Sequence, residues 1–150
     1  MGTLRRLLII TAALMCVLAL AAISAPRSSA STLPRRLIAL NWAEAQRGHW
    51  YCWGGTAGCF DCSGLVWAAY RHAGITLPRT TFGMLASSRL RWEPASARRR
   101  GDLAFYGPGH VELVTAHGTF GALQTGTQIW WHIPSGWWRP TEYFRVVGAG

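Results

Sequence analysis

Residues 60–74 read FDCSGLVWAAYRHAG, and their spacing predicts a helix with a cysteine in its first turn. From Cys62 onward the apolar residues recur at helical spacing up to Gly74, where a glycine is expected to end the helix. At a helix N-terminus the aligned peptide dipoles and the unpaired amides favour a thiolate over a thiol. The same amides can stabilise an oxyanion. The stretch therefore indicates that Cys62 is a nucleophile.

Around this stretch, the chain predicts helices first and a sheet afterwards. Helices are expected at 34–48 and 81–88, and the segment 94–100 is expected to be a surface connection. From Gly101 onward, apolar runs separated by glycine-containing turns predict strands at 102–106, 110–115, 119–123, 127–131 and 143–147. Helices followed by a meandering sheet predict an α+β domain.

Residues 1–30 have the features of a secretory signal peptide. Two arginines precede the apolar run 7–23, which is followed by small residues. Cleavage is expected after Ala30, with Ala25 as the alternative site, and the other interpretation is an uncleaved membrane anchor. Residues 31–150 are enough for one domain with a single core. We therefore expect a secreted protein, extracellular or associated with the cell wall, that touches a membrane only through an uncleaved leader.

The charge of the chain favours anionic partners. The net charge is +9, and about +6 remains without the leader, which contains three arginines and no acidic residue. All basic residues are arginines, whose planar fork suits carboxylates and phosphates. The cluster at 98–100 is either a solvated loop or an anchor for anionic wall polymers. No nucleic-acid partner is expected, because export separates the protein from nucleic acid and no recognition motif accompanies the charge.

Three cysteines remain after the leader, an odd number in an oxidising compartment, so one should stay free. If Cys62 is the free thiol, Cys52 and Cys59 can close a short loop whose glycines allow the bend. A bond between Cys59 and Cys62 would instead make a redox motif like that of thiol oxidoreductases. The spacing alone leaves the three pairings open.

Five short motifs follow one another along the chain. They are YCWGG at 51–55, FDCSGLV at 60–66, LPRT at 77–80, GDL at 101–103 and GHV at 109–111. In order and spacing they resemble the signatures of the NlpC-type cell-wall cysteine peptidases. The resemblance spans 37–147 and implies a papain-like fold, with N-terminal helices packed on a C-terminal antiparallel sheet. It also implies peptidoglycan as the substrate, cut in its stem peptides, typically between D-glutamate and diaminopimelate or at a related position.

The resemblance assigns roles to residues of this chain. Cys62 resembles the nucleophile of the family and His110 the general base, while Tyr51, Asp61 and Ser63 resemble residues that line the substrate cleft. The residues agree with this assignment, because a thiolate on a helix needs a base from another element, and His110 begins a predicted strand after a glycine turn. We expect no cofactor and no metal site, because the histidines are scattered along the chain and two of the three remaining cysteines can instead form a disulfide.

The chain departs from the family at the residue that orients the histidine. That position, twelve residues after His110, is Ala122. If residues 116–118 form a three-residue hairpin loop with a left-handed glycine, His110 lies opposite Gln124, whose amide could accept the imidazole N–H. His132 belongs to a later strand of unknown register. We therefore predict that Gln124 orients the base.

Two alternatives to a wall endopeptidase remain open at this point. One is a thiol oxidoreductase that uses Cys59 and Cys62, although redox chemistry requires neither the histidine strand nor the LPRT segment. The other is a non-catalytic binding protein with the same fold. Ala122 at the orienting position and the basic, tryptophan-rich composition favour this alternative.

Overall fold

The cysteine-bearing helix forms where the sequence predicts it. Helix α3 (Cys62–His72) begins directly after Asp61, whose side chain accepts a hydrogen bond from the backbone N–H of Gly64 at 2.6 Å. Asp61 is thus the N-cap, and it satisfies one of the amides that a helix N-terminus leaves unpaired. The chain turns away from the helix at Gly74, where φ is +77° and glycine carries no steric penalty.

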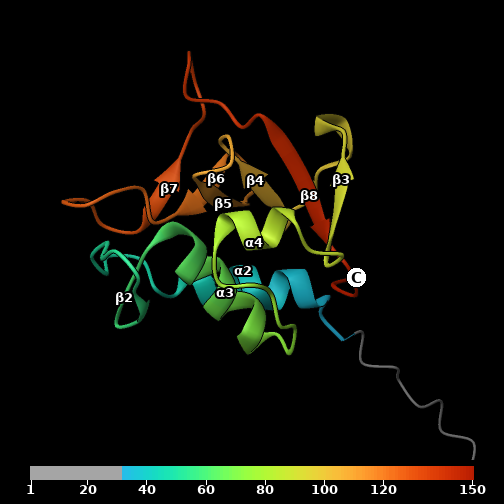
Figure 1. The fold of residues 1–150 in the computed structure, drawn as a ribbon, viewed down its shortest axis with the longest axis horizontal. Helices are drawn as coiled ribbons and strands as arrows, with labels where there is room; N and C mark the ends of the chain where they lie inside the picture. The colour runs from blue at the N-terminus through green and yellow to red at the C-terminus, as the bar shows by residue number, and fades with distance from the viewer. Residues whose placement is uncertain (1–31) are drawn as a thin grey trace, which may run out of the picture. The chain divides into compact units, whose positions relative to one another are not determined.

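The computed structural model describes residues 32–150, and Leu33–Gly150 form a single unit. The predicted signal peptide lies outside the described residues. Helix α2 (Arg35–Glu44) packs against α3, and the short helix α4 (Thr81–Leu85) is capped by the side chain of Thr80. The helices lie on one side of the sheet in Figure 1.

A six-stranded antiparallel sheet forms the second layer. Its order is β3-β8-β4-β5-β6-β7. The strands are β3 (Leu90–Glu93), β4 (Leu103–Phe105), β5 (Val111–Val114), β6 (Thr119–Gly121), β7 (Trp130–His132) and β8 (Glu142–Val146). A separate hairpin, β1 (Thr56–Ala57) with β2 (Cys59–Phe60), precedes α3, and a 3-10 turn (Ala95–Ala97) follows β3. The predicted α+β class is confirmed, although β3 was not predicted and β7 begins later than expected.

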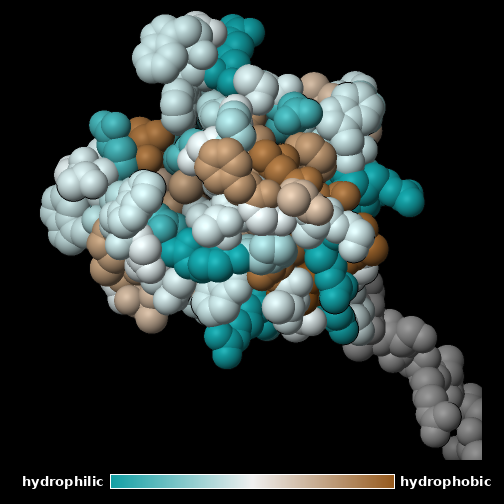
Figure 2. Space-filling view, in the orientation of Figure 1, coloured by the Kyte–Doolittle hydropathy of each residue, from teal (hydrophilic) through white to brown (hydrophobic). Residues whose placement is uncertain are grey.

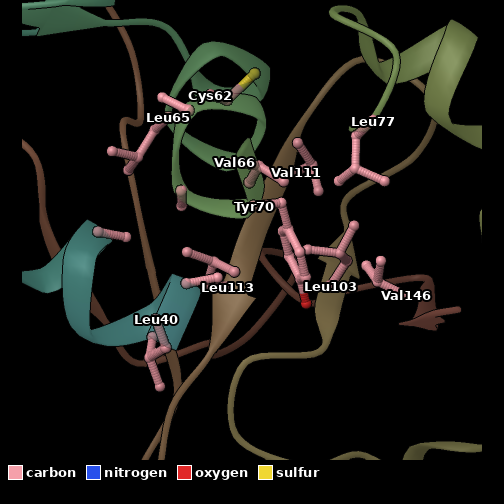
Figure 3. Packing of buried hydrophobic residues seen from close by; sticks show 14 of the residues in the cluster. Leu40, Cys62, Leu65, Val66, Tyr70, Leu77, Leu103, Val111, Leu113 and Val146 are labelled. Carbon is pink, nitrogen blue, oxygen red and sulfur yellow. The ribbon is translucent and has the colours of Figure 1, made fainter. Parts of the chain in front are cut away.

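The core fills the space between α3 and the sheet. Figure 3 shows Tyr70 reaching from α3 toward Leu103, Val111 and neighbouring strand residues, and its buried hydroxyl donates to the carbonyl of Gly101 at 2.6 Å. Cys62 lies at the other end of the helix, and its sulfur points away from this cluster. The core therefore fixes the helix, and the helix fixes the thiol.

The β5–β6 hairpin has a different register from the predicted one. Thr115 N–H donates to the carbonyl of Gly118 at 2.9 Å, and Val114 pairs with Thr119, so the loop has two residues instead of three. Gly118 is not left-handed; a Cβ there would lie 2.1 Å from the carbonyl oxygen of His132. Glycine is needed at this position for the close approach of β7. The predicted register is wrong by one residue, and such a slip exchanges the two faces of a strand.

Within residues 32–150, no helix has the length and apolar character needed to cross a membrane.

Candidate active site

Cys62 lies in a cleft of about 490 Å³. The three residues predicted to accompany it all line this cleft: Tyr51, Asp61 and Ser63. Arg79, Trp53 and Phe82 complete its walls, and neither aromatic residue was singled out from the sequence. Figure 2 shows hydrophobic residues gathered near α4, the helix that carries Phe82. The helix N-terminus thus opens into a space with polar and hydrophobic walls.

The cysteines pair in one of the ways that the sequence allowed. Cys52 and Cys59 form a disulfide, and Cys62 is the free thiol among the described residues. A thiol that is 9% exposed at the start of a helix remains available to a substrate in the cleft. The disulfide closes the loop that carries Trp53, and this arrangement leaves no Cys59–Cys62 redox pair.

A partly buried network holds the start of α3. Arg79 donates from Nη2 to Oδ2 of Asp61 at 2.8 Å and to the carbonyl of Gly55 at 3.2 Å. Its Nη1 donates to Oγ of Ser63 at 3.0 Å. Burial alone would raise the pKa of Asp61, but the bonds from Arg79 and from the amides of Gly64 and Gly54 lower it overall. Asp61 therefore stays ionised in the cleft wall.

His110 precedes the first residue of β5 and lies beside the thiol. Sγ of Cys62 is 3.9 Å from the carbonyl oxygen of Gly109, the residue before His110. The rings of Tyr106 and Trp138 lie 5.5 Å and 5.4 Å from the imidazole, centroid to centroid. These aromatic rings limit the access of solvent to the imidazole of His110, whose side chain is 13% exposed.

The imidazole is held by Glu112 and not by Gln124. Nε2–H of His110 donates to Oε1 of Glu112 at 3.1 Å, which leaves Nδ1 for the thiol. Glu112 is fully buried, and Nδ1 of His132 lies 2.8 Å from the same oxygen. This second approach is too oblique for a well-formed hydrogen bond, and we treat it as an electrostatic contact.

The prediction for Gln124 is therefore corrected. Gln124 follows the end of β6, is exposed, and uses its backbone to bond Thr127. With the observed register, an extension of the hairpin would not place it opposite His110. Ala122, at the position where the family orients its histidine, is fully buried in the core.

In this cluster the contacts between His110 and Glu112 favour the charged form of each side chain. Burial opposes the imidazolium, but hydrogen bonds with Cys62 and Glu112 and the charges of both raise the pKa of His110 to about 9. Burial likewise opposes the carboxylate, but the hydrogen bond from His110 and the close contact with His132 lower the pKa of Glu112 to about 2. At neutral pH the site thus holds an imidazolium beside the thiol.

A signal for Glu112 was present in the sequence. Residues two apart on a strand share a face, so the order His-Val-Glu at 110–112 places the carboxylate on the same side as the imidazole. The described residues contain no group of three or more His, Cys, Asp or Glu side chains arranged to hold a metal ion.

The fold and the site define a class of α+β domain in which a helix N-terminus presents a thiol to a histidine on an antiparallel sheet. A model of the NlpC/P60 family matches residues 48–134. The chain therefore belongs to the NlpC/P60 family, as the sequence motifs predicted.

Several relatives are named as enzymes of the cell wall. The chain is 35% identical over 119 residues to the peptidoglycan endopeptidase RipB of Mycobacterium tuberculosis, which covers 63% of this chain and 48% of RipB. It is 37% identical over 100 residues to the bifunctional muramidase/DL-endopeptidase CwlT of Bacillus subtilis, over 59% of this chain and 29% of CwlT. The chain thus spans about half or less of the length of these relatives.

Solved structures of the family share the fold. The structure of the peptidoglycan hydrolase RipB of Mycobacterium tuberculosis gives a TM-score of 0.66 at 28% identity, over 81% of this chain and 68% of that one. RipD, also from Mycobacterium tuberculosis, gives 0.63 at 26% identity, over 77% of this chain and 99% of that one. RipD is described as a non-catalytic domain adapted to peptidoglycan binding. The family therefore contains both hydrolases and binding proteins.

Proposed function

We propose that this protein is a secreted cysteine endopeptidase that cleaves the stem peptides of peptidoglycan. The observation that carries the proposal is the free thiol of Cys62 at the N-terminus of α3, next to an imidazole whose other nitrogen is bound by a buried carboxylate. A nucleophile, a base and a group that orients the base are the parts that acyl transfer through a thiol requires.

In the proposed reaction, the thiolate of Cys62 attacks the carbonyl carbon of the scissile amide. The resulting oxyanion can accept hydrogen bonds from the first-turn amides of α3, because the N–H groups of Cys62 and Ser63 have no bonding partner in the described part of the chain. His110 then gives its proton to the leaving amine, and the C–N bond breaks. Water, deprotonated by His110, hydrolyses the thioester and restores the thiol.

The cleft supports a peptide substrate with charged groups. Arg79 and Asp61 present opposite charges side by side, and Ser63 adds a hydroxyl. Burial, followed by the charges of Cys62 and Asp61, raises the pKa of Tyr51, so its phenol remains a donor at neutral pH. Amine and carboxylate groups of a stem peptide could be bound here. We propose the bond between D-glutamate and diaminopimelate, or a related stem position, as the one cleaved.

The remaining predictions concern location. We propose that residues 1–30 direct export and that the chain acts outside the cell or in the wall. Arg98 and Arg100 are exposed on the segment before β4, where they could contact anionic wall polymers. Mass spectrometry of the exported protein would show whether the chain begins at Ser31, and retention of the leader would contradict cleavage.

The test of activity is digestion of purified peptidoglycan and of soluble stem peptides by the full chain, with products identified by mass spectrometry. The control is Cys62→Ala, which removes the sulfur and little packing. Release of new amino termini by the wild type alone is the expected result. Equal product from the folded Cys62→Ala variant would contradict the proposal.

A non-catalytic wall-binding protein is the second candidate, and the described adaptation of RipD favours it. It predicts that wild type and Cys62→Ala sediment equally with peptidoglycan and that neither releases a product. Retention of a free thiol beside a bound imidazole favours the peptidase over this candidate.

A further inference from the structure

We infer that Glu112 and His132 together replace the family's missing third residue: Glu112 positions His110, and His132 holds Glu112 in place. This inference rests on the proposed peptidase function. Both are positioning residues, because they act on the substrate only through His110.

The three side chains converge because of strand register. Glu112 follows His110 by two residues and therefore shares its face of the sheet. On that face β6 carries Thr119, which pairs with His132 of β7. The carboxylate lies between the two imidazoles, with Oε1 3.1 Å from Nε2 of His110 and 2.8 Å from Nδ1 of His132.

The neighbouring strand is built to admit this carboxylate. A Cβ on Gly121 would lie 2.6 Å from Cγ and 3.0 Å from Cδ of Glu112. Real Cβ atoms essentially never approach other atoms this closely. Gly121 and Glu112 lie on the paired strands β6 and β5, so the backbone cannot easily move to relieve the clash. Any side chain at position 121 would displace Glu112 from the imidazole. Glycine is therefore required here by the lack of space, and not by its backbone conformation.

Burial makes a purely structural role for Glu112 costly. Its side chain is completely buried, and Oε2 has no hydrogen-bond partner among the described residues. A buried carboxylate destabilises a fold unless its partners offset the lost hydration, and an apolar residue of similar size often serves stability as well or better. The arrangement is better explained by the support that the carboxylate gives to a charged His110.

His132 supplies the second contact to Oε1 of Glu112. Its side chain is 18% exposed, and Nδ1 faces the oxygen that also binds His110. A carboxylate with one partner can rotate about its side-chain bonds, whereas contacts with two imidazoles, His110 and His132, restrict it. Nearby hydroxyls complete the surroundings, since Tyr106 and Thr119 bond each other at 2.9 Å. Trp138 stacks on Tyr106 at 4.4 Å, over the same cluster.

The first experiment compares Glu112→Gln with wild type. Glutamine keeps the shape but removes the charge, so kcat should fall about ten- to a hundredfold with a smaller change in KM. The alkaline limb of the kcat/KM profile should move to lower pH by about one unit, because a carboxylate favours the imidazolium. A folded Glu112→Gln variant with unchanged kcat and an unchanged alkaline limb would overturn the inference.

The second experiment uses a pair of variants of equal size at position 132. His132→Asn keeps a polar N–H group near the place of Nδ1, which can make the electrostatic contact with Glu112, whereas His132→Leu has none. We expect His132→Leu to lower kcat about tenfold and His132→Asn to recover most of the loss, while thermal unfolding of both variants is compared. His117→Ala, an exposed histidine at the hairpin loop, is the control and should leave kcat unchanged. Equal activity of the Asn and Leu variants would contradict a role for the polar contact between His132 and Glu112.

A measurement without substrate separates this inference from the proposed function. The rate at which iodoacetamide alkylates Cys62 reports the thiolate across the pH range. If Glu112→Gln and His132→Leu change this pH profile but the wild type releases nothing from peptidoglycan, the positioning network stands and the peptidase function fails. If the profile is unchanged in both folded variants, the network is refuted whatever the activity.

Discussion

Arg79 Nη2 lies 2.8 Å from Oδ2 of Asp61, the residue that caps the helix bearing Cys62. The other carboxylate oxygen accepts the amide of Gly64. One side chain therefore joins the start of α3 to the segment that leads to α4, and it forms part of the cleft wall at the same time. The stability of α3 and the position of the Cys62 thiol depend on the same contact.

We predict that Asp61→Ala lowers the free energy of unfolding by about 1–2 kcal/mol, because the helix loses its N-cap and Arg79 its partner. Asp61→Asn, which keeps an acceptor for the cap, should lose less. Because folding lowers the pKa of Asp61, its carboxylate stabilises the fold above its ordinary pKa of 3.8, and this stabilisation is lost as the pH falls. Urea unfolding at pH 7 and pH 3 measures both effects, and equal stability of all three proteins at pH 7 would contradict them.

Stability should also depend on pH through His110 and Glu112. The pKa of His110 rises from 6.5 to about 9 on folding, so its charge stabilises the fold fully below pH 6.5 and no longer above pH 9. The pKa of Glu112 falls from 4.5 to about 2, so its charge stabilises the fold above pH 4.5 and is lost toward pH 2. We therefore expect the Tm to fall as the pH rises from 6.5 to 9, and to fall again as the pH drops from 4.5 to 2. Glu112→Gln should flatten the decline between pH 6.5 and 9, and a wild-type Tm that rises over that range would refute the assignment.

The exposed aromatic residues of the cleft should contribute to substrate binding. Trp53 is 89% exposed, so truncation cannot remove much packing energy. We predict that Trp53→Ala raises KM about three- to tenfold and leaves kcat nearly unchanged, as expected for contacts made equally in the ground and transition states. Trp92→Ala, at an exposed tryptophan of β3 that does not line the cleft, is the matched control. Steady-state kinetics on a stem peptide compares the two, and equal effects would argue against a role for Trp53 in binding.

The disulfide should hold the loop that carries Trp53. The two cysteines are 7 residues apart in the sequence. Removing a disulfide that closes so short a loop lowers the free energy of unfolding by about 2–3 kcal/mol. We therefore expect a Cys52→Ser/Cys59→Ser variant to have a lower Tm and a higher KM, with Cys62 still alkylated by iodoacetamide. Peptide mapping of the native protein should find the Cys52–Cys59 bond. A native Cys59–Cys62 bond would favour the oxidoreductase alternative instead.

The local features of the site could be read directly from the sequence. The position of Cys62 at a helix start follows from the helical spacing of the apolar residues after it, which involves only residues close together in the chain. The α+β order follows from the change of periodicity near Gly101. Strand β3 was missed because it has only four residues, lies at the edge of the sheet and carries two charged residues, Arg91 and Glu93.

The orienting residue could not be fixed in the same way, because it depends on one residue of hairpin register. Sequence alone allowed either a two-residue or a three-residue loop, and the two choices place opposite faces of β6 beside His110.

The sequence by itself determined the order of the elements and singled out Cys62 and His110 as the candidate nucleophile and base, because these depend on short motifs and local spacing. Only the tertiary structure decided that Glu112, and not Gln124, binds the imidazole and that His132 meets the same carboxylate. The physical reason is that β7 packs closely against Gly118 and that Gly121 leaves room for Glu112, contacts between strands that no local pattern encodes.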